Sequence, residues 1–365
     1  MSSKLHKVII SGGGTGGHIF PAIAIANRIK EEYPDAEILF IGAEGKMEME
    51  KVPKSGYKII GLHIRGLSRK LSLDLIKFPF MVLKAVSKAK KIIKDFGPDV
   101  VIGVGGYASA PTLRAANSLG IPTLIQEQNS FAGKTNKWLS KKVKKICVAY
   151  DGMEKFFPKE KIVMTGNPVR KEVVTIEGKR ENGFKAFNLE PNKKTLLVIG
   201  GSLGARTINK SILAAKDSLL EKDIQIIWQC GKFYIEDYQK LVPNHPNIFL
   251  SDFIYNMDEA YACADFIVSR AGAISISELT IIGKPVILVP SPNVAEDHQT
   301  KNALALTKNN AALLVKDVDA EANLGKEILS LYQNEDQQKE LSKNIKEMAL
   351  DHATDLILEE IKQIV

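Results

Sequence analysis

The pattern of apolar and polar positions predicts short buried strands that alternate with longer helices. Runs of β-branched and other apolar residues at 8–10, 100–102 and 266–268 are bounded by polar or glycine-rich segments, which is typical of buried parallel strands. Apolar residues at helical spacing follow at 19–29 and 274–282. Strands that alternate with helices along the chain predict an α/β protein with parallel sheets.

The segment 265–299 shows this pattern most clearly. Strand 266–268 is followed by small residues, a helix that ends at Gly283, and a second strand at 286–289. Backbone N–H groups at the start of such a helix lack partners and the helix dipole is positive there, so this position suits a diphosphate. Glu278 lies farther along the helix, where its carboxylate could accept hydrogen bonds from both hydroxyls of a ribose. The alternative is an ordinary solvated glutamate.

Two parts of the chain repeat the same order of elements. Residues 98–125 and 264–289 both run through strand, glycine turn, helix, Gly, Pro and strand. We therefore expect two Rossmann-like, doubly wound halves with glycine loops at the carboxyl edges of their sheets. Residues 166–192 contain few strand-forming residues and make the best linker. This predicts a first domain at 1–166, a second at 167–344 and a helix at about 345–365 whose apolar stripe consists of Leu356, Ile357, Ile361, Ile364 and Val365.

Composition narrows the class of protein without fixing its ligand. The chain has 365 residues, 45% of them hydrophobic and 25% charged, which favours a globular protein of two domains. A net charge of +8 makes an anionic partner plausible, and leaves nucleic acid, anionic lipid and phosphorylated substrates open. The three cysteines have no CxxC spacing and indicate buried thiols in a reducing compartment. No signal peptide or membrane-spanning run is apparent, so we expect a cytoplasmic protein whose membrane contact is peripheral.

The first glycine loop carries a candidate base. Gly12, Gly14 and Gly17 formally match the dinucleotide fingerprint, but no acidic residue is well placed at the end of the second strand. His18 begins the next helix, where a protonated imidazole is disfavoured, so the side chain could stay neutral and accept a proton. The alternative is a histidine that serves only the geometry of the turn.

The segment 65–94 is basic and apolar at once. It has nine Lys or Arg and one acidic residue, interleaved with aliphatic and aromatic residues that include Phe78, Phe80 and Leu83. This composition favours an anionic membrane surface, although a core helix with a solvated face is the commoner structure. Nucleic acid is disfavoured as a partner because no zinc spacing, RNA-recognition signature or aromatic stacking pattern accompanies the charge.

Polar residues also follow two strands directly. Residues 126–129 come after the strand at 122–125, and residues 297–299 come after the strand at 286–289 and the loop that follows it. Amide groups at the carboxyl edge of a sheet can read sugar hydroxyls.

Seven motifs in order and spacing resemble the bacterial MurG-type glycosyltransferases, across nearly the whole chain. They are GGGTGGHIFPA, GVGGYASAP, EQN-x-x-AGKTNK, GNPVR, GGSLGAR, SRAGAISISE and DHQTKNA. The resemblance implies a GT-B architecture, with two Rossmann-like domains facing a cleft and the last helix returning to the first domain. It implies an inverting transfer of N-acetylglucosamine from UDP-N-acetylglucosamine to the C4 hydroxyl of undecaprenyl-diphosphate N-acetylmuramoyl-pentapeptide, a step of peptidoglycan synthesis at the inner leaflet of the membrane.

The same resemblance implies roles for individual residues. His18 would be the base, and the first domain would bind the acceptor and the membrane. Asn129 and Gln299 would read the donor sugar, Arg170 and Ser202 would lie by the nucleotide and its diphosphate, and Ile254 would pack at the uracil. The remaining residues border the phosphates, the acceptor or the ribose: Thr15, Gly16, Gly17, Gly105, Gly106, Tyr107, Ala273, Ile274, Ser275, Ile276, Ser277 and Glu278. Gln126 and Leu203 depart from the family pattern, where His and Gln are common. No cofactor is expected, and no metal, because helix-start N–H groups can hold the diphosphate without one.

Three other functions remain as alternatives. A glycolipid synthase of the same architecture would use diacylglycerol as acceptor, and the EQN and GNPVR motifs argue against it. The glycine-rich opening would also suit a nicotinamide-dependent oxidoreductase. A nucleotide-sugar sensor would bind the donor without turnover.

Overall fold

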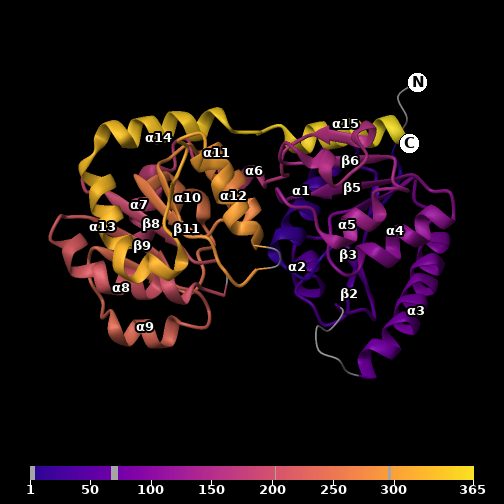
Figure 1. The fold of residues 1–365 in the computed structure, drawn as a ribbon, viewed down its shortest axis with the longest axis horizontal. Helices are drawn as coiled ribbons and strands as arrows, with labels where there is room; N and C mark the ends of the chain where they lie inside the picture. The colour runs from indigo at the N-terminus through magenta and orange to yellow at the C-terminus, as the bar shows by residue number, and fades with distance from the viewer. Residues whose placement is uncertain (1–4, 67–72, 202, 295–296) are drawn as a thin grey trace. The chain divides into compact units, whose positions relative to one another are not determined.

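The structure, a computed structural model, describes residues 5–66, 73–201, 203–294 and 297–365 and divides into two compact units (Figure 1). The first unit is Met1–Arg170 with Asp351–Val365, and the second is Lys171–Leu350. Each has a sheet in which all the paired strands run parallel, with helices around it. The α/β class predicted from the sequence is confirmed.

The first unit is built on a seven-stranded sheet of order β3-β2-β1-β4-β5-β6-β7. Ser11 at the end of β1 pairs with Ile41 of β2 and Gly103 of β4, so these strands end side by side. The order reverses between β1 and β4, which is where doubly wound sheets bind ligands. The strands are β1 (Lys7–Ser11), β2 (Glu37–Ala43), β3 (Lys58–Leu62), β4 (Val100–Gly103), β5 (Thr123–Glu127), β6 (Lys145–Val148) and β7 (Ile162–Met164).

Helices cover both faces of this sheet. Successive strand residues point to opposite sides, and apolar side chains on both sides need to be buried. Ile10 packs into one apolar cluster with α1 and α15, and Ile9 packs into another with α3 and α4. Both side chains are fully buried, which explains why the strands are apolar throughout rather than alternating. The helices are α1 (Gly16–Glu32), α2 (Glu48–Lys54), α3 (Leu73–Phe96), α4 (Ser109–Ser118), α5 (Lys134–Leu139) and α15 (Ala353–Ile364).

The helix α15 belongs to the first unit although the whole second unit precedes it in the chain (Figure 1). Ile357, Leu358 and Ile361 are buried against α1, each worth about 1.5–3 kcal/mol relative to exposure. Ion pairs from Asp355 to Arg28 and from Lys362 to Glu32 flank this contact. The predicted apolar stripe was wrong at two positions: Leu356 and Val365 are 43% and 39% exposed, and Leu358 is buried in their place.

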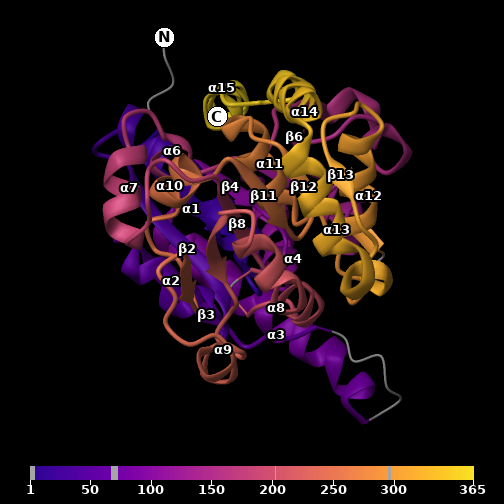
Figure 2. The same ribbon diagram turned by 90° about the vertical axis from the view of Figure 1, so that its left-hand side faces the viewer.

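The second unit has a six-stranded sheet of order β10-β9-β8-β11-β12-β13. Its strands are β8 (Thr195–Ile199), β9 (Gln225–Gln229), β10 (Ile248–Ser251), β11 (Phe266–Ser269), β12 (Val286–Leu288) and β13 (Leu313–Leu314). On one face α8 and α13 pack side by side, as both ribbon views show (Figure 2). The helices are α6 (Lys171–Val174), α7 (Arg180–Phe187), α8 (Arg206–Leu220), α9 (Ile235–Leu241), α10 (Met257–Cys263), α11 (Ala273–Ile282), α12 (His298–Thr307), α13 (Ala320–Gln333) and α14 (Glu335–Glu347).

Part of the segment expected to be a linker, residues 166–192, is helical and packs into the second unit. It contains α6 and α7, which pack against α10, and Phe184 and Phe187 are buried in the core of the second unit. Gly183 permits the close approach of α7, since a Cβ there would lie 2.5 Å from Cys263 Sγ. The boundary between the units falls after Arg170. Few strand-forming residues therefore meant helices here rather than an unstructured connection.

Candidate functional site

The first glycine loop connects β1 to α1 at the carboxyl edge of the first sheet. Thr15 is the N-cap residue, in an extended conformation, and its carbonyl accepts from His18 N at 3.1 Å and Ile19 N at 3.2 Å. Residues Gly16 and Gly17 form the first turn of α1, where backbone N–H groups have no intrahelical acceptor. These positions thus offer donors to an anion at the sheet edge.

The ring of His18 is held by the loop that precedes its helix. Its Nδ1 lies 3.1 Å from the carbonyl oxygen of Gly13 and 3.3 Å from Thr15 Oγ1. A carbonyl oxygen only accepts, so the Gly13 contact is a hydrogen bond when Nδ1 carries the proton. In a neutral imidazole this leaves Nε2 as the acceptor, which is the form that a general base requires.

The second glycine loop, after β4, packs directly on the first. A Cβ at Gly105 would lie 2.8 Å from His18 Nε2, and a Cβ at Gly106 would lie 2.3 Å from the carbonyl oxygen of Gly13. Both glycines have positive φ, 92° and 86°. The ring of Tyr107 in turn lies over Gly66, whose Cβ would come within 2.5 Å of it. The structure therefore brings Thr15–His18 together with Gly105 and Gly106.

The polar segment 126–129 differs from its sequence-based description. The strand β5 extends to Glu127, and Gln126 is fully buried, with its Nε2 donating to Asn167 Oδ1 at 2.9 Å. The side chain of Gln126, one of the two departures from the family pattern, therefore lies inside the first unit. Asn129 follows the strand and donates from its backbone N to Glu127 Oε1 at 3.2 Å. The other oxygen of Glu127 accepts from Asn136 Nδ2 at 2.9 Å, so a buried carboxylate anchors the loop that carries Asn129.

Arg170 is the last residue of the first unit. Its guanidinium lies over the ring of Phe20, which is on α1, with 4.7 Å between the guanidinium carbon and the ring centroid. This cation–π contact ties the GNPVR segment to the helix that begins with the first glycine loop.

The second unit contains a cavity of about 460 Å³ at the carboxyl edge of its sheet. Ser275 and Gln299, both singled out from the sequence, line it, together with residues of the GGSLGAR and SRAGAISISE motifs and others outside any motif. The lining comprises Ile199, Gly200, Gly201, Gly204, Ala205, Arg206, Thr207, Tyr234, Ser269, Arg270, Gly272, Ser275, Ser291, Asn293, Gln299 and Asp317. Ser202 lies outside the described residues.

The start of α11 opens onto this cavity. Gly272 is the N-cap residue, and the side chains of Ala273 and Ile276 are buried in the core. Among the other residues of this turn, Ile274, Ser275, Ser277 and Glu278 are half-buried. The N–H groups of the first turn have no partner within the helix, so an anion in the cavity could accept from them.

Three further donor-site candidates have identified contacts. Glu278 Oε2 accepts from the hydroxyl of Tyr261 at 3.0 Å. The side chain of Ile254 is buried, and its backbone N donates to Gln229 Oε1 at 3.0 Å. Gln299 Oε1 accepts from Ser291 N at 2.8 Å, which orients its amide.

A polar network that the sequence analysis missed forms one wall of the cavity. Arg270 Nη1 donates to Val289 O at 3.0 Å and pairs with Asp317. The second oxygen of Asp317 accepts from Thr207 Oγ1 at 2.9 Å. Arg270 directly follows β11 within a quoted motif, so its place at the sheet edge was a usable signal. Asp317 has no comparable local signal, because its partners are 47 and 110 residues away.

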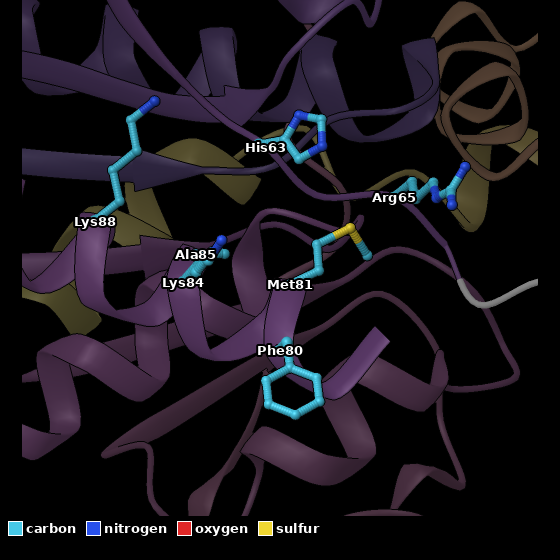
Figure 3. A pocket seen from close by; sticks show the side chains of 7 residues that line it. All are labelled: His63, Arg65, Phe80, Met81, Lys84, Ala85 and Lys88. Atoms are coloured by element: carbon cyan, nitrogen blue, oxygen red, sulfur yellow. The ribbon is translucent and has the colours of Figure 1, made fainter. Parts of the chain in front are cut away.

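A separate basic and apolar surface lies on the first unit, around α3. A cavity of about 510 Å³ is lined by His63, Arg65, Phe80, Met81, Lys84, Ala85 and Lys88. Met81 extends from α3 toward the segment with His63 and Arg65, whereas the ring of Phe80 points away (Figure 3). Phe80 and Leu83 are 67% and 60% exposed, and Phe78 is half-buried. Lys88 donates to Glu44 at 3.0 Å, and this hydrogen bond, opposed by slight burial, holds the pKa of the Glu44 carboxyl below its usual range.

Family models match both halves of the chain. The model of the glycosyltransferase family 28 N-terminal domain matches residues 8–148, and that of the family 28 C-terminal domain matches residues 195–357. The chain belongs to glycosyltransferase family 28. The resemblance drawn from the seven motifs is thereby confirmed, and this family membership makes the chain an enzyme.

Two curated members of the family are similar over their full length. The chain is 58% identical to a protein of Cytophaga hutchinsonii, over 99% of this chain and 98% of the relative. It is 54% identical to a protein of Parabacteroides distasonis, over 99% of both. Both relatives are named UDP-N-acetylglucosamine–N-acetylmuramyl-(pentapeptide) pyrophosphoryl-undecaprenol N-acetylglucosamine transferase.

Solved structures agree with the fold. The crystal structure of Acinetobacter baumannii MurG matches with a TM-score of 0.77 and 29% identity, over 98% of this chain and 99% of that one. The UDP complex of S. aureus MnaA matches with a TM-score of 0.71 at 15% identity, over 98% and 96%, and supports the fold alone. The GT-B type of α/β fold expected from the motifs is therefore confirmed in this family 28 chain.

Proposed function

We propose that this chain transfers N-acetylglucosamine from UDP-N-acetylglucosamine to the C4 hydroxyl of undecaprenyl-diphosphate N-acetylmuramoyl-pentapeptide, with inversion. The observation that carries the proposal is the 58% identity, over 99% of the chain, to a relative whose name states this donor sugar and this lipid-linked acceptor. The product would be the disaccharide-linked precursor of peptidoglycan.

In this proposal the second unit binds the donor. The cavity of about 460 Å³ has the size of a small-molecule site and combines helix-start N–H groups with Arg206 and Arg270. Such donors suit the diphosphate without help from a metal. Residues 273–278 would wrap the diphosphate and ribose, with Glu278 on the ribose hydroxyls. Ile254 would pack at the uracil, Ser202 would lie by the diphosphate, and Gln299 would read the sugar.

The first unit supplies the base and binds the acceptor. Nε2 of His18 takes the proton of the C4 hydroxyl as its oxygen attacks the anomeric carbon of the donor. The bond from that carbon to the diphosphate oxygen breaks at the same time, and UDP leaves with the electron pair. Attack opposite the leaving group inverts the anomeric centre. Gly105, Gly106 and Tyr107 would border the acceptor, Thr15, Gly16 and Gly17 would border phosphates, Asn129 would read the donor sugar, and Arg170 would lie near the nucleotide.

The surface around α3 would hold the enzyme at the cytoplasmic face of the cell membrane. Within the described ranges, no helix is long and apolar enough to cross a bilayer. Phe80 lines the same cavity as Arg65, Lys84 and Lys88, and Leu83 is exposed on the same helix, so apolar insertion and attraction to anionic lipid would act at one surface. This contact would be peripheral, and the acceptor's lipid would lie in the same leaflet.

A transfer assay with labelled UDP-N-acetylglucosamine tests the function. The acceptors are a short-chain analogue of the lipid-linked muramoyl-pentapeptide, diacylglycerol in mixed micelles, and no lipid. Product from the muramoyl acceptor alone, with a β linkage by NMR, supports the proposal. Product from diacylglycerol alone would identify a glycolipid synthase instead. Donor binding by calorimetry without any product would indicate a nucleotide-sugar sensor.

A further inference from the structure

Glu48, the first residue of α2, has a buried carboxylate that contacts the backbone of the first glycine loop. Only 1% of the residue is exposed. Its Oε2 accepts from the backbone N of Gly14 at 2.8 Å, and its Oε1 accepts from the backbone N of Ala43 at 3.0 Å. A buried carboxylate needs such donors, and charge-assisted bonds of this kind are the stronger ones. The side chain thus joins the loop to the end of β2.

The glycines around Glu48 leave room for this arrangement. A Cβ at Gly13 would lie 2.2 Å from the carboxyl carbon of Glu48, and a Cβ at Gly42 would lie 2.6 Å from its Cγ. On the other side of the loop, a Cβ at Gly106 would meet the carbonyl oxygen of Gly13 at 2.3 Å. The Gly13 backbone is therefore enclosed between the carboxylate and the second glycine loop.

The N–H that donates to Glu48 and the carbonyl oxygen that lies near His18 belong to one peptide group. Gly14 N and Gly13 O are the two polar ends of the Gly13–Gly14 peptide, which is planar and trans. Its N–H end faces Glu48 at 2.8 Å, and its C=O end lies 3.1 Å from His18 Nδ1. Because the group is rigid, fixing one end fixes the direction of the other.

We propose that Glu48 is the positioning residue of His18, acting through the Gly13–Gly14 peptide. The carboxylate orients and polarises this peptide, whose carbonyl then accepts from Nδ1–H and holds the ring in the tautomer with an unprotonated Nε2. Hydrogen bonds in a chain strengthen one another, so the negative charge of Glu48 also favours the imidazolium formed when Nε2 takes a proton. The role of Glu48 in turnover rests on the proposed function, whereas its effect on the tautomer of His18 does not.

The matched variants are Glu48→Gln and, as a control, Glu50→Gln on the same helix. Glu50 is exposed and pairs with Lys54 at 2.7 Å, so its replacement changes charge on α2 without reaching the loop. The amide of Glu48→Gln places a donor against one of the two backbone N–H groups, so one accepted bond is lost. We expect kcat to fall roughly 10- to 100-fold, because the base is no longer held in its working form. The KM for UDP-N-acetylglucosamine should stay within about twofold of the original value.

The acidic limb of the kcat/KM profile should move to lower pH in Glu48→Gln and stay in place in Glu50→Gln, since only the first weakens support of the imidazolium. A fall in turnover that matches the loss of folded protein, with an unchanged limb, would reduce Glu48 to a loop anchor and overturn the proposal.

The tautomer is read directly by NMR of the chain with ¹⁵N-labelled histidine, assigned with His18→Asn. The unsubstituted protein should show neutral His18 with the proton on Nδ1, and Glu48→Gln should show a mixture. A proton on Nε2 in the unsubstituted protein would overturn the inference even if Glu48→Gln does not fold. If transfer to the muramoyl acceptor is absent while the Nδ1–H form is present, the proposed function fails and the positioning role stands.

Discussion

The Nδ1 atom of His18, on α1, lies 3.1 Å from the carbonyl oxygen of Gly13, five residues earlier in the glycine loop. This contact selects the ring nitrogen that carries the proton and leaves Nε2, beside Gly105, able to accept one. The glycine loop therefore favours the tautomer of the candidate base that has its proton on Nδ1.

Replacing His18 by Ala removes the proposed base but leaves the donor cavity of the second unit intact. We expect turnover to fall by roughly two orders of magnitude or more, because general base catalysis contributes about 10²–10⁴. The dissociation constant of UDP, measured by calorimetry, should stay near its original value. Near-unchanged turnover in His18→Ala would remove this residue from the role.

Replacing Glu278 by Ala should weaken UDP binding, since a charged acceptor for the ribose hydroxyls is lost. A hydrogen bond to a charged group is worth about 1.5–3 kcal/mol, so the dissociation constant should rise by roughly 10- to 100-fold. Tyr261→Phe, which removes the hydroxyl that Glu278 accepts from, should have a smaller effect. The matched control is Glu340→Ala, an exposed residue of α14. Equal affinities for UDP in Glu278→Ala and in the control would make Glu278 an ordinary surface residue.

Gly106→Ala should abolish most activity without affecting UDP binding. The new Cβ would lie 2.3 Å from the carbonyl oxygen of Gly13, so the two glycine loops would have to separate. Displacing catalytic groups by about 1 Å costs about 10² in rate. Gly120→Ala is the control, because that glycine also has positive φ but has no atom within 4 Å of its Cβ position. If both variants retain the same activity, the contact between the loops has no importance for catalysis.

The exposed apolar residues of α3 are tested with the double variant Phe80→Asp, Leu83→Asp. Two carboxylates at this surface should be repelled by anionic lipid and no longer insert, so binding to phosphatidylglycerol vesicles should fall at least about tenfold. Sedimentation with vesicles measures this binding. Leu241→Asp, at an exposed site on α9, serves as the control. Undiminished sedimentation of the double variant would count against a membrane role for α3.

Lys284 predicts a rise in stability at alkaline pH. Its ammonium donates to the carbonyls of Ala262 and Ala264, and burial, followed by the nearby charge of Arg180, lowers its pKa to about 8 from an ordinary value of 10.5. Between these values the unfolded chain binds more protons than the folded one, so unfolding free energy rises with pH across that window. The rise is at most about 1.4 kcal/mol per pH unit.

Urea unfolding of the original chain and of Lys284→Met, between pH 7.5 and 10, measures this contribution. The other titrating groups are common to both proteins, so the difference in stability between them reports on Lys284. The stability of the original chain relative to Lys284→Met should increase as the pH rises above 8. A difference that stays flat or decreases across the window would show that Lys284 keeps an ordinary pKa in the folded protein.

Local pattern was enough to predict the elements that carry the glycine loops. The strand before Gly12 and the helix that contains Ala273 have buried apolar residues at regular spacing, and each ends at a glycine or a polar residue. Gln126 was misplaced because a polar residue at the carboxyl end of a strand reads as a loop. The structure buries it by supplying Asn167 as a partner from 41 residues away.

The features missed were those that depend on distant partners. Glu48 appears in the sequence as an ordinary acidic residue near a helix start, and only the fold shows its carboxylate against Gly14 and Ala43. Asp317 likewise gains its place through Arg270 and Thr207. The amphipathic pattern predicted that the last helix exists but not which of its faces is buried. Leu356 was therefore predicted to be buried, whereas Leu358 is the buried residue.

The position of α15 has a consequence for biosynthesis. A ribosome must make all of the second unit before it reaches the helix that seals the first one against α1. Until Ile357, Leu358 and Ile361 emerge, the apolar surface of α1 in the nascent first half stays exposed to solvent. A chaperone would bind this surface, and a chain released from the ribosome before α15 is made would aggregate through it.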